Sequence, residues 1–420
     1  MARRNHTDWP LFAALCLFFA VPFLYQCVRT GLIAAIPDTD GLGIAGHIEW
    51  FDLVNETVQA FLVVPLYYLL GVVREDRPSL KGRLRASFLV STVLYAALVA
   101  AAFLSCSGIV SVMTGGADAG VVRYLRLESI GFVLGHISGF AAVVFVVVGK
   151  PSYIMALTVG KAVMTVFSDL VLIPAFGVDG VAYSNITVNA VAGIVCFGLI
   201  EFREFRHVIP VKSSGWIIRW AGIGLFSGGQ ILLDNLIYAL IVCRMVNDVA
   251  GQGDYWVANN FIWGCLLVPV LALSEIIKRE NDPGRFRKYA SVSVAIAVCW
   301  VVSIPVWKPF FRYAMGIGNP DNIFRIVLML LPFYVAYEFS SICAGIFTAA
   351  GKTAYNCIIS AVVNIGYYGV MYALYLRGIF CADMTFICCL FGGGMAVNAI
   401  CGMVLLRRLR KTLDCAIFQR

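Results

Sequence analysis

The length of the apolar segments constrains the fold of this chain more than any other feature. Of the 420 residues, 60% are hydrophobic and only 13% are charged, whereas roughly 25% are charged in ordinary soluble proteins. A helix that crosses about 30 Å of hydrocarbon needs roughly 20 consecutive, mostly apolar residues. The sequence predicts twelve such helices, at about 10–36, 48–72, 86–108, 126–149, 152–174, 181–200, 217–247, 256–277, 290–307, 324–349, 354–376 and 384–406. We therefore expect an all-α polytopic membrane protein, because these runs lack the alternation of membrane β-strands.

The basic residues predict how these helices are oriented. With the N-terminus in the cytoplasm, 23 of the 32 Lys and Arg residues fall on the inner side and six on the outer side. This bias follows the positive-inside rule and predicts that both termini are cytoplasmic, in a cell membrane. The net charge of +8 is then mainly a topology signal, and we expect no nucleic-acid partner.

Two motifs recur in the same order in the two halves of the chain. Residues 149–153 (GKPSY) match 351–355 (GKTAY), and 54–65 parallel 258–269 at nearly the same offset. Six spans in each half is an even number, so both halves enter the membrane from the same face. The repeats are then parallel and related by a pseudo-two-fold axis, with any substrate path between them.

This duplication predicts an N-terminal six-helix lobe at 1–205 and a C-terminal six-helix lobe at 206–420. The arrangement is typical of secondary transporters. Channels and membrane proteins without transport activity are also built by duplication, so they remain alternatives at this point.

The segment 168–182 resembles the fifth-to-sixth helix signature of the multidrug and toxic compound extrusion (MATE) family. It has Asp169 near the end of one helix, followed by a glycine-rich turn and small residues. The segment 348–353 is similar to the family's turn after the tenth helix, and the resemblance covers nearly the whole chain. It implies a cation-coupled antiporter for multidrug efflux. The family usually has Pro after the fifth-helix acid, whereas Leu170 stands here.

Two acids lie near the middle of predicted spans in the second half, Asp234 in the seventh and Glu338 in the tenth. An acid in hydrocarbon costs roughly 2.5 kcal/mol or more, so each needs a partner or a cavity. The resemblance implies that both acids couple transport to Na⁺ or H⁺. Because Na⁺ prefers oxygen ligands, we expect help from Asn235, Asn259, Asn260 and Ser340. The alternative is an ion pair, for example with Arg244, that only joins helices.

In the first half, Asp169 matches the family's fifth-helix acid and is expected either to couple to a cation or to form a structural pair. Asn185 and Asn189 are four residues apart, so they share a helix face that is predicted to meet this acid. Some relatives have a second acid on the first helix. Here that helix has Gln26 and Arg29 instead.

The remaining charges inside spans support a competing hypothesis. Arg29, Lys161 and Arg244 would suit a flippase for lipid-linked saccharides, since basic groups neutralise phosphate. Because at least four acids accompany these three bases, we rank the flippase second. We also expect Lys161 to pair with Glu56 or Glu128, and Glu128 to lie near a solvated span end.

Polar and aromatic residues in helices expected to border a cleft are candidates for holding an organic cation by the faces of their rings. These substrate-cleft candidates are Tyr25, Gln26, Gln230, Tyr238, Trp263, Tyr334, Tyr337 and Tyr367. Packing between helices is the alternative role for each aromatic residue.

The sequence does not satisfy two motifs that are typical of enzymes. Five residues separate Gly345 from Gly351 where a phosphate-binding loop requires four, and no His-Glu-x-x-His motif occurs. We therefore expect no enzyme, no cofactor and no metal beyond Na⁺. The predicted function is that of a monomer in the lipid bilayer that exports amphipathic, cationic organic compounds, driven by an ion gradient.

Overall fold

The computed structural model describes residues 8–418 except 35, 37–43, 45–47, 115–117, 212–214, 243–244, 247–248, 250–251, 281–284, 316 and 381–382. Over the described residues, its regular elements are all helical. The chain divides into two compact units, Met1–Gly224 and Leu225–Arg420.

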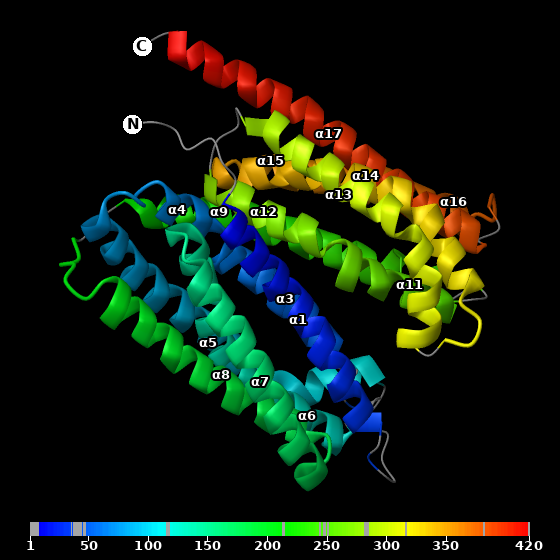
Figure 1. Ribbon diagram of the computed structural model, residues 1–420, viewed down its shortest axis with the longest axis horizontal. Helices are drawn as coiled ribbons and strands as arrows, with labels where there is room; N and C mark the ends of the chain where they lie inside the picture. The colour runs from blue at the N-terminus through cyan, green and yellow to red at the C-terminus, as the bar shows by residue number, and fades with distance from the viewer. Residues whose placement is uncertain are drawn as a thin grey trace. The chain divides into compact units, whose positions relative to one another are not determined.

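The helices of the first unit run alongside one another (Figure 1), with α6 packed between α5 and α8, and α7 between α1 and α8. The elements are α1 (Trp9–Ala34), α3 (Ile48–Leu62), α4 (Val64–Gly71), α5 (Arg77–Thr114), α6 (Ala119–Val148), α7 (Pro151–Phe176), α8 (Asp179–Gly198) and η1 (Leu199–Glu204). Helix α9 (Trp216–Ile237) begins in this unit and continues into the second.

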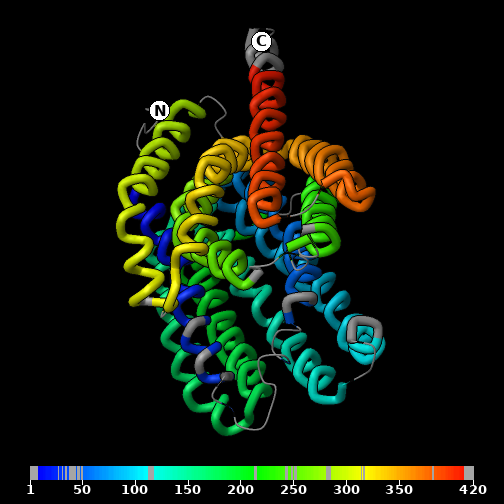
Figure 2. Tube along the Cα trace, turned by 90° about the vertical axis from the view of Figure 1, so that its right-hand side faces the viewer, coloured from blue at the N-terminus to red at the C-terminus, as the bar shows by residue number. Residues whose placement is uncertain are grey.

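The second unit is built around α14, which packs against α11, α12, α13 and the long helix α17, drawn in red in Figure 2. Its elements after α9 are η2 (Tyr238–Val242), α11 (Gln252–Phe261), η3 (Ile262–Leu266), α12 (Val268–Glu280), α13 (Phe286–Pro309), η5 (Phe310–Ala314), α14 (Asp321–Ala349), α15 (Thr353–Ala361), η6 (Val362–Gly369), α16 (Val370–Leu376) and α17 (Met384–Phe418).

The prediction of an all-α polytopic membrane protein is confirmed. Eleven helices of the described chain are long and apolar enough to cross a membrane. A twelfth crossing results if Gly253–Leu266 and Val268–Glu280, which meet at a bend of 49°, form one broken span. This bent pair covers the eighth span that the sequence predicts at about 256–277.

The two matching GKxxY turns have the same geometry. Their glycines adopt positive φ angles of 77° and 67°, a conformation that favours glycine. In each turn the lysine amide donates to the carbonyl of a phenylalanine five residues earlier, at 2.9 and 2.7 Å. That phenylalanine packs edge-to-face on the tyrosine, with ring centroids 5.2 and 5.3 Å apart. The matched residues are Phe145, Gly149, Lys150 and Tyr153, and Phe347, Gly351, Lys352 and Tyr355. This agreement supports an internal duplication.

Helix α5 begins nine residues before the span predicted from about residue 86, because Asp76 caps its first turn. The amide of Ser79 donates to the Asp76 carboxylate at 3.4 Å. The basic residues that the sequence places in a loop are therefore helical, and they meet two acids of η1. Glu201 and Glu204 form ion pairs with Arg77, Lys81, Arg85 and Lys150. Much of the positive charge at this end of the first unit is thus neutralised within the unit.

Glycines on α6 allow α8 to approach closely. A Cβ atom on Gly131 would lie 3.5 Å from the Asn185 side chain, and one on Gly135 would lie 3.3 Å from the Asn189 amide. Small residues at such spacing are a common device for packing helices in membranes. Here they bring the polar side chains of α8 against the interior face of α6.

Helical segments of π geometry are frequent in the second unit, where η2, η3, η5 and η6 lie among the described residues. A π turn contains more residues than an α turn, and such turns often occur at functional sites. Segment η6 directly follows α15 and contributes to the site described below.

Candidate functional site

Asp234 on α9 is surrounded by neutral hydrogen-bond donors. The Ser360 hydroxyl donates to its Oδ1 at 2.6 Å, and the Asn364 amide donates to the same oxygen at 2.5 Å. The Gln230 amide donates to Oδ2 at 3.3 Å. These four residues are called the Asp234 cage below. Within the described part of the chain, no Lys or Arg forms an ion pair with Asp234, and the suggested partner Arg244 lies outside the described residues.

Polar residues at intervals of four along α15 and η6 organise the cage. Asn356 is tied to α14 by bonds of 3.2 Å to the Ala344 carbonyl and to the Thr348 hydroxyl. Ser360 and Asn364 come next on the same side, and Asn364 donates to Ser360 Oγ at 3.0 Å. The sequence prediction missed these residues, although polar residues spaced by four inside an apolar span were a usable signal.

The predicted helpers of Asp234 are placed differently. The Ser340 hydroxyl donates at 2.8 Å to the Tyr337 carbonyl of its own helix. Asn259 is half-buried and Asn260 is exposed on α11, and Asn235 neighbours Asp234 on α9. The hydrogen bonds to the Asp234 carboxylate described above come instead from Ser360, Asn364 and Gln230.

Glu338 on α14 is fully buried, with an exposed fraction of 0%. Neither carboxyl oxygen has a hydrogen-bond partner within the described structure. Glu338 is among the residues that line a groove between α13 and α14, whereas the cage is built from α9, α15 and η6. The two acids predicted together thus occupy separate surroundings in the second unit.

Asp169 on α7 forms a buried, two-pronged ion pair with Arg29 on α1. Arg29 Nε lies 2.8 Å from Oδ2, and its Nη2 lies 3.1 Å from Oδ1. The exposed fractions of the two side chains are 8% and 1%. The charge of Asp169 is therefore compensated within the first unit. This agrees with the alternative that Asp169 forms a structural pair.

The structure places Asn185 and Asn189 against α6 rather than against Asp169. The Asn185 amide donates to both oxygens of Glu128 at 2.9 and 3.0 Å, and the Asn189 amide donates to the Gly131 carbonyl at 3.2 Å. The expectation that Glu128 lies near a solvated span end is wrong, since the residue is only 3% exposed. Helix α6 starts at Ala119, so Glu128 lies in its third turn.

Lys161 also differs from its prediction. Its ammonium donates to the Ser138 hydroxyl on α6 at 3.4 Å, and the Glu128 carboxylate accepts from Asn185 instead. Glu56, the other suggested partner, is exposed on α3.

Several of the substrate-cleft candidates form an aromatic cluster in the second unit. Tyr337 packs edge-to-face on Trp263 and Tyr334, with ring centroids 5.9 and 6.0 Å apart. Tyr238 packs on Trp256 at 6.4 Å, and a Cβ atom on Gly393 would overlap the Tyr367 hydroxyl. These contacts give the aromatic side chains packing roles within their own unit.

The other two cleft candidates lie on α1, near the Asp169 pair. Tyr25 is half-buried, one turn before Arg29, and Gln26 is exposed. Gln230, the remaining candidate, belongs to the Asp234 cage.

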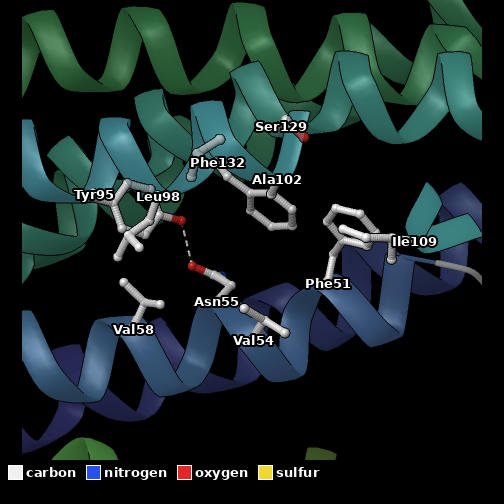
Figure 3. A pocket seen from close by; sticks show the side chains of 11 residues that line it. Phe51, Val54, Asn55, Val58, Tyr95, Leu98, Ala102, Ile109, Ser129 and Phe132 are labelled. Carbon is white, nitrogen blue, oxygen red and sulfur yellow. Dashed lines mark hydrogen bonds between the residues drawn. The ribbon is translucent and has the colours of Figure 1, made fainter. Parts of the chain in front are cut away.

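The first unit contains a separate apolar pocket of about 300 Å³ between α3, α5 and α6 (Figure 3). Figure 3 shows a hydrogen bond between two lining residues, in which the Tyr95 hydroxyl donates to Asn55 Oδ1 at 2.6 Å. The Tyr95 ring stacks on His136 at 4.6 Å, and that imidazole lies 3.2 Å from both Gln59 Oε1 and Ser91 Oγ. His136 is thus a packed residue, held by neutral groups.

Among the described residues, no group of three or more His, Cys, Asp or Glu side chains is arranged to hold a metal ion. The Asp234 cage is a different kind of environment, because one carboxylate is combined with hydroxyl and amide groups. Such a set suits a proton or a hard monovalent cation.

Comparison with known proteins agrees with this architecture. No protein-family model matches the sequence, and no curated protein matches it. The fold is similar to that of a MATE transporter in the straight conformation, with 15% identity, a TM-score of 0.81 and coverage of 97% of this chain and 96% of that chain. It is also similar to the outward-facing conformation of a multidrug resistance MATE family transporter, with 15% identity, a TM-score of 0.80 and the same coverage.

A third similar structure is a transporter of the MOP superfamily from Pyrococcus furiosus, with 15% identity, a TM-score of 0.76 and coverage of 97% and 96%. Its binding pocket is described as having reversed polarity, which suggests a different function for that protein. At these identities the likeness concerns the fold. The chain therefore has the fold of the MATE transporters of the MOP superfamily, a family of transporters rather than enzymes.

Proposed function

We propose that this protein is a secondary active transporter that exchanges Na⁺ or H⁺ for amphipathic, cationic organic compounds and exports them by alternating access. The distribution of basic residues supports a cytoplasmic membrane with both termini in the cytoplasm. The observation that carries the proposal is the Asp234 cage.

Among the described residues, no positive charge compensates the carboxylate of the cage, which lies inside a membrane-spanning helix. Hydrogen bonds from Ser360, Asn364 and Gln230 stabilise the carboxylate but bring no positive charge. A buried carboxylate without a counter-charge is costly, so a proton or a cation stabilises the cage when it binds. A group that alternates between empty and occupied states in this way is what an antiporter requires.

The same residues offer the ligands that Na⁺ prefers. Asp234 contributes two carboxylate oxygens, and Ser360 contributes its hydroxyl oxygen. The side-chain amides of Asn364 and Gln230 each contain a carbonyl oxygen, which faces the site when the amide group is turned. The cage therefore supports coupling to Na⁺ as well as to H⁺.

The other two predicted coupling acids receive different support. Asp169 is already neutralised by Arg29, which favours a structural role in the first unit. Glu338 has no hydrogen-bond partner among the described residues and is a second carboxyl in the same unit as Asp234. We accordingly assign the main coupling role to Asp234.

A flippase for lipid-linked saccharides would use basic groups to bind phosphate. Arg29 directs two of its three guanidinium nitrogens at Asp169, so its positive charge is already compensated by this acid. This observation favours export of organic cations over the flippase.

The test is transport in proteoliposomes that contain the purified protein and a fluorescent lipophilic cation. Substrate movement driven by a Na⁺ gradient is compared with movement driven by a pH gradient. Loss of a charge-assisted contact is worth roughly 1.5–3 kcal/mol, so Asp234→Asn is expected to reduce ion-driven transport about ten- to hundredfold.

The matched control is Asp321→Asn, which alters an exposed acid at the start of α14. This variant is expected to transport normally. Ion-driven transport that persists unchanged in Asp234→Asn would disprove the coupling role. Movement of a fluorescent lipid-linked saccharide, without movement of the cation, would favour the flippase.

A further inference from the structure

A second pocket of the first unit lies between α5, α6 and the end of α8, and its walls are rich in phenylalanine. Its volume is about 500 Å³, within the range of roughly 300–1,000 Å³ that is common for small-molecule sites. The phenylalanines that line it are Phe88 on α5, Phe140 on α6, Phe197 on α8 and Phe202 on η1. The Phe88 ring connects the walls, because its centroid lies 5.2 Å from that of Phe140 and 6.4 Å from that of Phe197. We call this site the phenylalanine pocket.

Two charged residues also line the pocket, and they lie where apolar segments of the sequence end. Arg85 directly precedes the predicted span 86–108, and Glu201 directly follows the predicted span 181–200. Ile137 of α6 lines the pocket as well and lies eleven residues before the end of that helix, which corresponds to roughly 16 Å along its axis. The pocket therefore extends from the boundary of the hydrocarbon layer into the membrane-spanning region.

The apolar part of the pocket is accessible from the lipid bilayer. Phe197 and Phe202 are 49% and 68% exposed, and α8 and η1 together form a candidate membrane span. Large apolar side chains that are exposed on a membrane-spanning helix contact hydrocarbon. A lipid chain therefore reaches the phenylalanine rings without crossing a polar layer.

The charged end of the pocket has more positive than negative charge. Four bases form ion pairs with the two acids of η1, so two positive charges have no matching acid in this cluster. Arg203 and Arg206 add to the excess, since both are exposed and neither forms an ion pair among the described residues. Asp76 at the start of α5 offsets one of these charges. The surroundings of the charged end therefore remain positive and attract an anion.

Arg85 has a hydrogen-bonding group left for a ligand. Its Nε donates to Glu201 at 3.4 Å and its Nη2 donates to the same carboxylate, while its Nη1 has no hydrogen bond within the described part of the chain. The Arg85 side chain is 50% exposed. Because a guanidinium presents several N–H groups in a planar fork that matches phosphate oxygens, Arg85 can bind a phosphate while it keeps its contact with Glu201.

We propose that the phenylalanine pocket binds an anionic diacyl phospholipid, with the phosphate against Arg85 and one acyl chain along the phenylalanine rings. The site goes beyond the exchange of ions for organic compounds, because it lies apart from the Asp234 cage and takes a component of the bilayer. Basic pockets between membrane-spanning helices are a recurrent means of holding anionic lipid head groups. The basic residues predict that this end of the unit faces the cytoplasm, so the lipid belongs to the inner leaflet.

Charge and apolar surface together select this class of ligand. An organic cation is repelled by the positive cluster, and a free phosphate ion leaves the apolar walls uncovered. A zwitterionic phospholipid brings a quaternary ammonium group next to its phosphate, and that group is repelled by Arg203 and Arg206. An anionic phospholipid suits both ends, since its phosphate forms charge-assisted hydrogen bonds and its chain covers apolar surface.

The proposal is tested by photolabelling the full chain in phosphatidylcholine nanodiscs with phosphatidylglycerol that carries a diazirine on one acyl chain and, separately, with the matching phosphatidylcholine. Labelled peptides are mapped by mass spectrometry. Phosphatidylglycerol is expected to label the α5 and η1 peptides more strongly than phosphatidylcholine does, and soluble glycerol 3-phosphate is expected not to displace it. Arg85→Gln is expected to weaken the binding of phosphatidylglycerol about five- to tenfold, as the loss of one basic residue at the membrane surface predicts.

The matched control for Arg85→Gln is Arg123→Gln. Arg123 is also an exposed base with an acidic partner, but it pairs with Asp179 at the start of α8, the opposite end of that helix. This variant is expected to label like the wild type.

Two further comparisons keep the result interpretable. Glu201→Gln removes the acid that competes for Arg85 and is expected to strengthen labelling by phosphatidylglycerol, which a loss of structure would not do. Phe202→Ala removes an apolar wall and is expected to reduce labelling, whereas Phe167→Ala, at a similarly exposed position on α7, is not. Equal labelling by the two lipids, displacement by glycerol 3-phosphate, or labelling that Arg85→Gln, Glu201→Gln and Phe202→Ala all leave unchanged would overturn the proposal.

Discussion

The first unit holds Asp169 against a guanidinium, whereas the second unit holds Asp234 against amides and a hydroxyl. Arg29 brings a full positive charge to its acid at 2.8 and 3.1 Å. Ser360, Asn364 and Gln230 bring only dipoles to theirs. A compensated charge has little to gain from a mobile ion, while an uncompensated one gains a great deal. The difference teaches that acids in two similar spans can have opposite electrostatic surroundings, and the ion-exchange role that we propose for Asp234 depends on this difference.

The largest effect is expected when the ion pair between Arg29 and Asp169 is broken. Arg29→Ala leaves Asp169 buried and unpaired, so the free energy of unfolding should fall by about 3–5 kcal/mol. Thermal and denaturant unfolding in detergent measure this loss. The double variant Arg29→Met with Asp169→Leu removes both charges and should recover most of the stability. If Arg29→Ala is as stable as the wild type, the ion pair is not what holds α1 to α7.

The two matching turns allow the units to be compared at equal positions. Gly149→Ala and Gly351→Ala each place a side chain at a positive φ, which costs about 1–2 kcal/mol. Because the turns share hydrogen bonds and ring contacts, the two losses in stability should agree. Gly139→Ala is the control, since a Cβ atom there meets nothing within 4 Å. A large loss for one turn and none for the other would contradict their equivalence.

A smaller effect is expected from loosening the cage. Ser360→Ala removes one hydrogen bond to Asp234, which should lower the free energy of unfolding by about 0.5–1.5 kcal/mol. It should also weaken the stabilisation that Na⁺ or acid gives to the protein, measured as the ion dependence of the melting temperature. Ser340→Ala is the matched control, because that hydroxyl donates to the Tyr337 carbonyl of its own helix and not to the cage. Equal ion dependence in both variants would place the ion outside the cage.

The membrane architecture could be predicted from the sequence because it depends on local properties, namely apolar length and basic flanks. Asp234 and Glu338 could be found for the same reason, since an acid in an apolar run is conspicuous wherever the helix points. The partners of Asp234 were missed, because a spacing of four marks a shared helix face but does not show which neighbour that face meets. Asn185 and Asn189 have the same spacing as Ser360 and Asn364, yet the first pair faces Glu128 and the Gly131 carbonyl rather than the predicted acid.

The surroundings of Glu128 were predicted wrongly because the start of its helix was placed too late in the sequence. The sequence predicts that the fourth span starts at about residue 126, which places Glu128 near a solvated span end. In the structure α6 begins at Ala119, and Arg123 forms an ion pair with Asp179 at the start of α8. Arg123 can lie inside α6 because Asp179, at the start of the neighbouring helix, pairs with it. The sequence does not show this pairing, because it depends on where α8 lies in the fold.

The π geometry of η6 has a mechanical consequence for the cage. Asn364 lies inside η6, whereas Ser360 lies before it in α15. Each residue of an α-helix turns the chain by about 100°, so rewinding a π turn into α geometry rotates whatever follows by a comparable angle. Such a change of winding swings the Asn364 amide away from Asp234 while Ser360 stays in place. It would also turn α16, so the direction of α16 and the hydrogen bond from Asn364 to Asp234 would change together.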